Sequence, residues 1–544
     1  MINRITFLCL ITVFLIGCQT GQRERDTVSD NPQIVTSPNG VVSSAHPLAT
    51  WAGVLMLDNG GNAFDAAVAT GFAIAVVEQS MNGLGGRFQA IIRNSDGEVT
   101  GIDATTQAPL SYDPATATQA RTGYPTIGVP GVVKGLITLL EKHGTMDLAI
   151  VMAPAIEYAE HGYHLLPMAA NRHAAAINDI RKYEGTSQYF LNGDTTYLAG
   201  ELFVQKDLAN TLRLISEQGS DAFYKGEIAE KMVADVQANG GYLDMESLAN
   251  YEAKESRVVS GSYRGYDISS LWIPSFGAIT IEMLHIMENW PLSENSDVEW
   301  ANAFYQANTL AYRDRRRQAS DEMADLLTSK AYAKAKADSM NSLLGKQAAM
   351  AYHQDDQMTR DGHTTHFSVV DKEGNMLAIT QTVGPNMGSK VATPGLGFLY
   401  ATTLGGYLGD FQPGQRASSH ISPTIVTKDG NPYLVLGAAG GSRIPTAIVQ
   451  TISRMIDRGM GLPEAMAAGR VHSVDTAILV EMHEGTSWTA TDLEEMRKLG
   501  LEVVEMNQKG TFGRVHAIYF DEKSQNWTGS ADPDWEGTSE ASKN

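Results

Sequence analysis

The chain has 544 residues, of which 43% are hydrophobic and 19% charged, a composition typical of globular proteins and unlike that of disordered ones. Its formal net charge is −21, which disfavours binding to phosphate backbones or anionic lipid surfaces, so we set nucleic-acid binding aside. The length allows several domains, but equally a single large α/β enzyme.

The first 17 residues have the pattern of a signal peptide. Arg4 supplies a positive charge, and the apolar stretch Ile5–Ile16 is too short to span a bilayer comfortably. The sequence Leu15-Ile16-Gly17-Cys18 resembles the lipobox of bacterial lipoproteins, in which the cysteine is acylated and becomes the mature N-terminus. An ordinary signal peptide with a chance cysteine is the alternative. We therefore expect a lipid anchor at Cys18 that holds the protein in the cell envelope, on the outer membrane facing the periplasm.

The second cysteine, Cys9, lies within the segment that would be removed. The mature chain would then hold no thiol except its anchor, which excludes a disulfide, a cysteine-ligated metal and a cysteine nucleophile. Residues 18–34 are polar and charged and predict a tether between the anchor and the folded domain.

Helical patterns dominate the first two thirds of the chain. Residues 45–79 predict two helices, interrupted at Asn59-Gly60-Gly61-Asn62, and a hairpin turn follows at residues 94–97. Residues 128–344 are mostly helical in pattern, and the segments 205–219 and 300–321 are amphipathic over more than two turns.

Strands prevail from His363 onward, with further helices near residues 446–458 and 491–498. Helices, strands, strands and helices in this order predict an α/β (α+β layered) fold. We expect an αββα sandwich, in which two stacked, mainly antiparallel sheets lie between helical layers.

Residues 363–382 read HTTHFSVVDKEGNMLAITQT and predict a β-hairpin. A three-residue loop, Lys372-Glu373-Gly374, with the glycine in the left-handed region is a favoured closure. In this register, paired residue numbers sum to 746, so Thr364 faces Thr382. Threonine is common in strands, and the pattern alone does not distinguish a catalytic pair from two strand residues.

The segment HTTHFSVVDKEGN resembles the start of the small subunit of the γ-glutamyltranspeptidases, which are N-terminal nucleophile hydrolases. Further blocks resemble those of the family in the same order: NGGNAFDAAVATGFAIAVVEQ, NGLGGRFQAII, IGVPGVVKGL, ASSHISPTIV and GAAGGSRI. The resemblance extends from Ser43 to Asp532.

This resemblance implies that Thr364 is the nucleophile. A threonine hydroxyl needs a nearby base, and an α-amino group, which titrates near pH 8, is a free base at neutral pH more often than a lysine. Only cleavage between His363 and Thr364 creates that amine on the nucleophile itself. The resemblance thus implies a large segment, residues 35–363, and a small segment, residues 364–544, which stay associated in one intertwined catalytic domain. Thr382 would orient or activate the Thr364 hydroxyl.

Other site residues also follow from the resemblance. Gly440 and Gly441 match the glycines whose N–H groups stabilise the oxyanion, although a tight turn would explain them too. Ser418 and Ser419 match a serine pair that binds the α-carboxylate of a glutamyl group. Asp410, before Phe411, matches the aspartate that receives the substrate ammonium, with a solvent-facing loop aspartate as the alternative.

The chain departs from the family at three positions. Thr105 stands where the family has the arginine that binds the α-carboxylate, and Gly384 stands where an asparagine is expected. Arg87 replaces a glycine and is the nearest candidate for the missing charge. Without a replacement cation, we expect weak use of glutathione.

We expect neither a cofactor nor a metal. His363 and His366 flank the threonines, but no further ligands accompany them in the sequence. The leading hypothesis is a γ-glutamyltransferase or glutathione hydrolase that acts on a small-molecule amide or peptide through an acyl-enzyme. The alternatives are an acylase of the same family acting on a non-glutamyl amide, and an uncleaved, inactive envelope lipoprotein.

Overall fold

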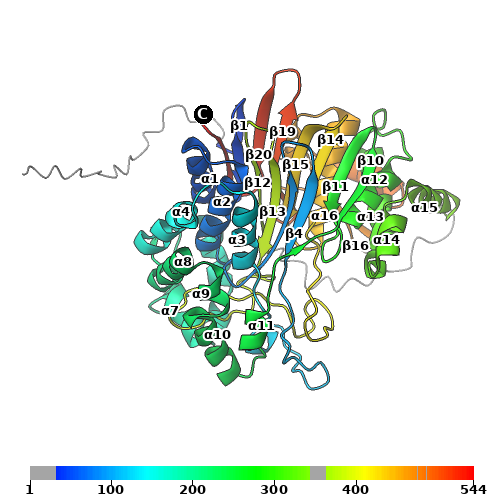
Figure 1. Ribbon diagram of the computed structural model, residues 1–544. Helices are drawn as coiled ribbons and strands as arrows, with labels where there is room; N and C mark the ends of the chain where they lie inside the picture. The colour runs from blue at the N-terminus through cyan, green and yellow to red at the C-terminus, as the bar shows by residue number, and fades with distance from the viewer. Residues whose placement is uncertain (1–31, 344–362, 475, 486) are drawn as a thin grey trace, which may run out of the picture.

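Two seven-stranded antiparallel sheets form the centre of the computed structural model (Figure 1). The structure describes residues 32–343, 363–474, 476–485 and 487–544; the expected signal peptide, Cys18 and most of the tether lie outside these ranges. The strands of the first sheet, in spatial order, are β1 (Ile34–Ser37), β20 (Asn526–Ala531), β19 (Arg514–Asp521), β15 (Asn431–Ala439), β14 (Thr424–Lys428), β11 (Tyr266–Leu271) and β10 (Val258–Tyr263).

The second sheet holds the predicted hairpin at its centre. Its strands, in order, are β21 (Thr538–Ala541), β2 (Val41–Ser44), β12 (Thr365–Val370), β13 (Met376–Thr382), β3 (Arg87–Arg93), β4 (Val99–Ala104) and β9 (Lys254–Glu255). All neighbouring strands in both sheets are antiparallel.

Helices cover the outer face of each sheet, so the predicted αββα sandwich is confirmed (Figure 1). On the side of the second sheet lie α1 (Pro47–Asp58), α2 (Ala63–Val77), α3 (Val132–His143), α4 (Leu148–His161), α5 (Pro167–Ala175), α8 (Lys206–Gln218) and α10 (Glu227–Ala238). On the side of the first sheet lie α12 (Gly277–Met287), α13 (Asp297–Tyr312), α14 (Asp321–Leu327), α15 (Lys330–Leu343) and α16 (Arg443–Arg458).

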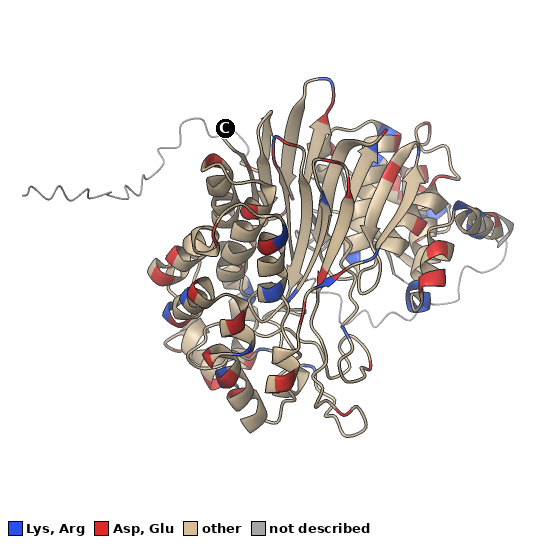
Figure 2. Ribbon diagram, viewed as in Figure 1, with Lys and Arg blue, Asp and Glu red and all other residues tan. Residues whose placement is uncertain are grey.

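Hydrophobic cores lie between the successive layers. One core packs α1–α4 and α8 on the second sheet, and another packs α12, α13 and α16 on the first. The third lies between the sheets and includes Ile91, Ala378, Ile425 and Val435. Figure 2 shows acidic and basic residues mainly on the outer helices and loops, while the strands are almost free of charge. None of the helices in the described part of the chain is both long and apolar enough to cross a membrane.

Local sequence explains the element boundaries near the site. The Asn59–Asn62 interruption ends α1 and starts α2, because Gly60 has a φ of +88° and the Asn62 side chain accepts hydrogen bonds from the N–H groups of Phe64 and Asp65. Every residue of α2 is buried, and apart from Asp65 and Thr70 its side chains are apolar, as expected of a helix enclosed on all sides.

The sequence prediction missed the hairpin β10–β11, which interrupts the helical region 128–344. It also did not anticipate the small sheet of β16 (Val471–Val474), β17 (Ala477–Glu481) and β18 (Glu502–Met506), which contains a parallel pair. Strand β1 begins at Ile34, one residue inside the predicted tether, and the Gln33 side chain donates hydrogen bonds to backbone carbonyls near the C-terminus.

Candidate active site

The predicted hairpin has the predicted register. Thr365 at the start of β12 pairs with Gln381 of β13, which puts Thr364 opposite Thr382 one step further on. The Thr364 hydroxyl donates a hydrogen bond of 3.2 Å to Thr382 Oγ1. Both side chains are buried. The structure therefore brings together the two hydroxyl groups that the sequence singled out.

The hairpin loop is held from two directions. Gly374 has a φ of +91°, the left-handed conformation that the three-residue loop requires. Asp371 accepts a hydrogen bond of 3.0 Å from the Asn375 N–H and one of 2.9 Å from the N–H of Ala63, the first residue of α2. The loop is therefore fixed to the helical layer as well as closed on itself.

The carbonyl of His363 lies against both hydroxyl groups. Thr382 Oγ1 donates to the His363 carbonyl oxygen at 2.8 Å, and the Thr364 hydroxyl lies 2.5 Å from the same oxygen. The N–H of Gly384 in turn donates to Thr382 Oγ1 at 2.9 Å. The Thr382 hydroxyl thus donates to the oxygen on which negative charge would develop if Thr364 Oγ1 added to the His363 carbonyl carbon.

Gly384 has a structural role that the sequence did not reveal. Its φ is +95°, and this conformation aims its N–H at Thr382. Glycine adopts positive φ freely, and asparagine is among the residues that tolerate it best. The residue type expected in the family and the one found here thus meet the same backbone requirement.

The two histidines beside the threonines lie in different surroundings. The His363 imidazole is buried, and burial with the nearby positive charge of Arg172 holds its pKa well below the usual value, so the ring is neutral. His366 is buried between the sheets, where its Nδ1 lies 2.8 Å from Thr380 Oγ1 and its ring packs on Gly437. His366 therefore belongs to the core.

Arg172 is a neighbour of the site that sequence reasoning did not identify. It comes from α5 and contacts His363 Nδ1, although 191 residues separate the two in the chain. Its guanidinium also lies 5.0 Å from the centre of the Trp535 ring. No local pattern around Arg172 marks this contact, since it depends on how α5 packs.

Gly440 and Gly441 follow β15 and lead into α16. Their φ values are +141° and +59°, and a β-carbon on Gly440 would come within 2.9 Å of Gly513 Cα. Within the described residues, neither glycine N–H donates a backbone hydrogen bond. Two free N–H groups beside a helix N-terminus suit a developing negative charge, and their role as oxyanion donors stays a prediction.

The serine pair lies beside Thr105. The Thr105 hydroxyl is buried and donates to the Ala417 carbonyl at 3.0 Å, and Ser418 and Ser419 come next in the chain. The Ser419 N–H donates to the Pro274 carbonyl at 2.9 Å, while its buried Oγ has no partner among the described residues. Ser418 and Ser419 therefore directly follow the residue that Thr105 contacts, and their role in binding a carboxylate stays a prediction.

Asp410 lies on an exposed part of the loop that precedes the serines. The neighbouring Phe411 is buried against Ala108 and Tyr112. No hydrogen bond or ion pair between described residues connects Asp410 to the nucleophile. Its role toward a substrate ammonium stays a prediction.

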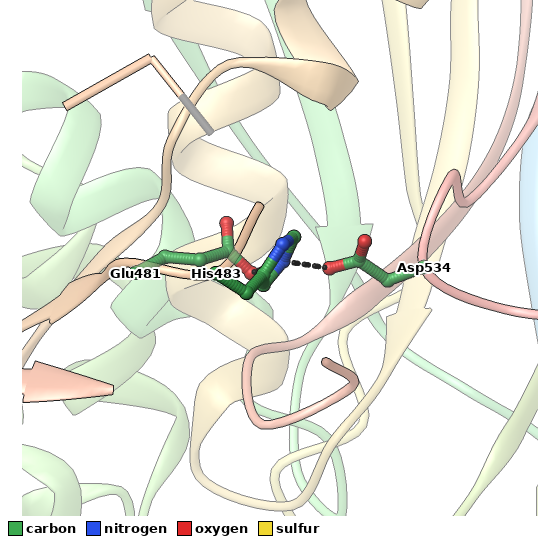
Figure 3. A group of neighbouring side chains, drawn as sticks. All are labelled: Glu481, His483 and Asp534. Atoms are coloured by element: carbon green, nitrogen blue, oxygen red, sulfur yellow. Dashed lines mark hydrogen bonds and ion pairs between the residues drawn. The ribbon is translucent and has the colours of Figure 1, made fainter. Parts of the chain in front are cut away.

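A cluster with metal-ligand geometry occurs elsewhere, among the described residues. Glu481, His483 and Asp534 have ligand atoms within 4.8 Å of one another (Figure 3). However, Arg470 pairs with Glu481 at 2.7 Å and with Asp532 at 3.0 Å, and it also contacts Asp534. A cation is therefore already present, and the group forms a buried ion-pair network between β17 and the C-terminal segment.

The chain is similar to known proteins over most of its length. A family model described as Gamma-glutamyltranspeptidase matches residues 49–542. A glutathione hydrolase proenzyme of Pseudomonas sp. (strain A14) is 36% identical over 483 residues, covering 80% of this chain and 82% of that protein. An acylase ACY 1 proenzyme of Pseudomonas sp. (strain V22) is 32% identical over 461 residues, covering 80% and 83%. A cephalosporin acylase from Bacillus halodurans has a crystal structure that superposes with a TM-score of 0.85 at 26% identity, covering 96% of this chain and 99% of that one.

Replacing Thr382 tests the hydroxyl geometry. Thr382→Ala removes the donor to the His363 carbonyl and the acceptor of the Thr364 hydroxyl, so we expect cleavage of the His363–Thr364 bond and later turnover to slow about 100- to 1,000-fold. Thr382→Ser keeps the hydroxyl and should retain most of both rates. Gel densitometry against time measures cleavage, and an unchanged thermal midpoint verifies folding. Equal cleavage rates in wild type and Thr382→Ala would contradict this role.

The ion-pair network predicts a pH-dependent stability. Burial opposes the charged form of His483, but the Glu484 carbonyl and the carboxylates of Asp534 and Glu481 outweigh it and raise the pKa of His483 above 6.5. A raised pKa gives stability that is complete below about pH 6.5 and is lost as the pH rises through the folded-state value. We expect His483→Gln to cost about 0.5–1 kcal/mol in unfolding free energy near pH 5.5 and almost nothing near pH 8.5. Urea unfolding at both pH values measures this; a cost that grew with pH would refute it.

Proposed function

Because the chain belongs to the γ-glutamyltranspeptidase family, we propose that it is a self-cleaving N-terminal threonine hydrolase or acyltransferase that acts on γ-glutamyl amides. The observation that carries this proposal is the position of the Thr364 and Thr382 hydroxyl groups on the His363 carbonyl. These groups surround the bond that must break to release the Thr364 amine.

Self-cleavage begins with addition of Thr364 Oγ1 to the His363 carbonyl carbon. The Thr382 hydroxyl stabilises the negative charge that develops on the carbonyl oxygen. The Thr364 nitrogen gains a proton as its bond to the His363 carbon breaks, which leaves an ester between the two residues. Water then hydrolyses the ester, giving a carboxylate on His363 and a free amine on Thr364.

In the cleaved enzyme, the Thr364 amine acts as the base. It takes the proton of the Thr364 hydroxyl as that oxygen attacks the substrate amide carbonyl, and it later returns the proton to the departing amine. The N–H groups of Gly440 and Gly441 are the expected donors to the oxyanion, and Thr382 orients the nucleophile. Water or an acceptor amine then takes the acyl group from Thr364.

The leading substrate class is γ-glutamyl amides such as glutathione. The names of similar glutathione hydrolase proenzymes support it, as does the assembly of Ser418 and Ser419 beside Thr105. The runner-up is an acylase that acts on a non-glutamyl amide. Thr105 in place of the family arginine supports that reading, together with the acylase names of other similar proteins. An uncleaved, inactive envelope protein is disfavoured by the hydroxyl geometry at His363.

We further propose that the protein is lipid-anchored in the cell envelope through Cys18. The support is the sequence Leu15-Ile16-Gly17-Cys18 after a short apolar segment. Gln19, in place of an aspartate that would favour inner-membrane retention, points to the outer membrane.

Self-cleavage is tested by the size and N-terminus of the purified protein. We expect two fragments of 346 and 181 residues, from Cys18 to His363 and from Thr364 to Asn544. Mass spectrometry should show that the smaller fragment begins at Thr364. Both fragments should co-purify, and the purified complex should hydrolyse a γ-glutamyl anilide. Thr364→Ala lacks the attacking oxygen and should stay intact and inactive. An intact wild-type chain with full activity would refute the mechanism.

The anchor is tested by fractionation of cells. Cys18→Ser lacks the acylated thiol, so we expect it to move from the membrane fraction to the soluble envelope fraction. Wild type and a Cys9→Ser variant serve as controls, because Cys9 lies in the removed segment. Membrane association of Cys18→Ser equal to that of wild type would point to another anchor.

A further inference from the structure

Four side chains form a row across the second sheet at the catalytic end. Thr364 lies opposite Thr382, and Thr382 pairs with Arg87 of β3. The register of β3 with β4 puts Thr105 opposite Arg87, one step beyond the last paired residues. Residues directly opposite in an antiparallel sheet project from the same face. Arg87 therefore lies on the face of the nucleophile, between it and the position where the family has its arginine.

The guanidinium of Arg87 lies beside Gly384, the residue that bonds to Thr382. Its Nη2 lies 3.4 Å from the point that a β-carbon on Gly384 would occupy. The N–H of Gly384 is itself bonded to Thr382 Oγ1. With strands about 4.8 Å apart, the Arg87 backbone lies on the order of 10 Å from that of Thr364, one strand nearer than Thr105.

The residues at positions 87 and 384 have exchanged sizes relative to the family pattern. The family pattern has a glycine at position 87 and an asparagine at position 384, whereas this chain has Arg87 and Gly384. A side chain at position 384 would meet both the Arg87 guanidinium and the Tyr407 ring, whose Cε1 lies 3.2 Å from the same β-carbon position. The absent side chain of Gly384 thus provides the space that the guanidinium occupies.

Arg87 carries a charge that no described residue neutralises. Its side chain is 1% exposed, Nη2 donates to the Thr402 carbonyl, and Nε has no partner among the described residues. No carboxylate in the described chain forms an ion pair with it. Burial lowers the pKa of Arg87 to about 10, which leaves the group cationic at neutral pH. A buried cation without an anion is unfavourable, so the site suits a ligand that brings one.

The other arginine close to Thr105 is already neutralised. Arg416 pairs with the Asp103 carboxylate at 2.8 Å and donates to the Glu252 carbonyl. Its guanidinium also lies 5.3 Å from the centre of the Tyr251 ring. The Arg416 guanidinium is thus already engaged by Asp103, Glu252 and Tyr251. Arg87 is the cationic member of the row of four side chains.

We propose that Arg87 binds a carboxylate on the acyl group of the substrate, replacing the charge that Thr105 does not supply. The inference rests on the proposed function and defines its donors as amides whose acyl group ends in a carboxylate, as γ-glutamyl and glutaryl groups do. Arg87 would offer N–H donors in a planar fork to that carboxylate, with the Ser419 hydroxyl as a neutral partner. The Tyr407 ring lies beside the same position, since its Cε1 and the Arg87 Nη2 both approach the point that a β-carbon on Gly384 would occupy.

The test compares two anilides that differ in one group. Glutaryl p-nitroanilide carries the carboxylate, and its carboxamide analogue has the same length without the charge. For the cleaved wild-type enzyme, we expect kcat/KM to favour the carboxylate by about 10- to 1,000-fold, mainly through KM. In Arg87→Gln this ratio should fall toward one, and in Arg87→Lys it should be partly restored.

Two further variants separate binding from structure. Arg87→Gln combined with Thr105→Arg returns the charge to the neighbouring strand and should restore the carboxylate preference. Arg93→Gln alters an arginine at the far end of the same strand, where Arg93 bonds to the Gly430 carbonyl, and should keep the wild-type ratio. If Arg87 only supported the loop through Thr402, Arg87→Gln would lower kcat/KM equally for both substrates, and the combined variant would not restore the carboxylate preference. That result overturns the proposal.

Inhibition of the wild type keeps the inference testable if Arg87→Gln does not fold. Glutaramate, which keeps one carboxylate, should inhibit more strongly than the uncharged diamide glutaramide by a similar factor, and equal inhibition by the two overturns the proposal. Hydrolysis of both anilides without a carboxylate preference would refute this inference alone. Failure to form a small fragment beginning at Thr364 would refute the proposed function itself.

Discussion

The pairing register between β12 and β13 is the constraint on which the candidate site depends. Side chains alternate between the two faces of a strand, so a slip of one residue would replace Thr382 by a neighbour that points to the other face. The loop at Gly374 sets the register, and Asp371 holds that loop to α2. The same register carries through β13 to β3 and aligns Arg87 with the threonines. One short loop therefore positions Thr364, Thr382 and Arg87 together.

Much of this could be predicted from the sequence, because it depends on local pattern. The hairpin loop is encoded within five residues, and the break between α1 and α2 lies in Asn59–Asn62. The hairpin β10–β11 was missed because it lies between strongly helical segments. The contact of Arg172 with His363 was also missed, since the two residues are far apart in the chain and neither has a distinctive neighbour pattern. Tertiary packing decides such contacts, and one sequence does not display it.

The protein manages its buried charges in two different ways. Arg470 lies among Glu481, Asp532 and Asp534, so its charge is neutralised within the fold and secures β17 to the C-terminal segment. Arg87 has only a carbonyl as its described polar partner. A neutralised charge contributes to structure. A buried charge without a partner raises the free energy of the empty site, and this cost is relieved when an anion binds there. The cost of leaving Arg87 unpaired is thus a reason to regard it as part of substrate recognition.

The sheet order also shows how the fold would tolerate the proposed cleavage between His363 and Thr364. In the second sheet, β12 and β13 from beyond the cleavage point lie between β2 and β3 from before it. In the first sheet, β14 pairs with β11 from the other segment, and β20 pairs with β1. Thr364 precedes the first paired residue of β12, so breaking its bond to His363 removes no strand pairing. Separation of the two segments would require both sheets to open, which exposes the core between them. Cleavage can therefore free the Thr364 amine while the surrounding structure holds that amine in place beside Thr382.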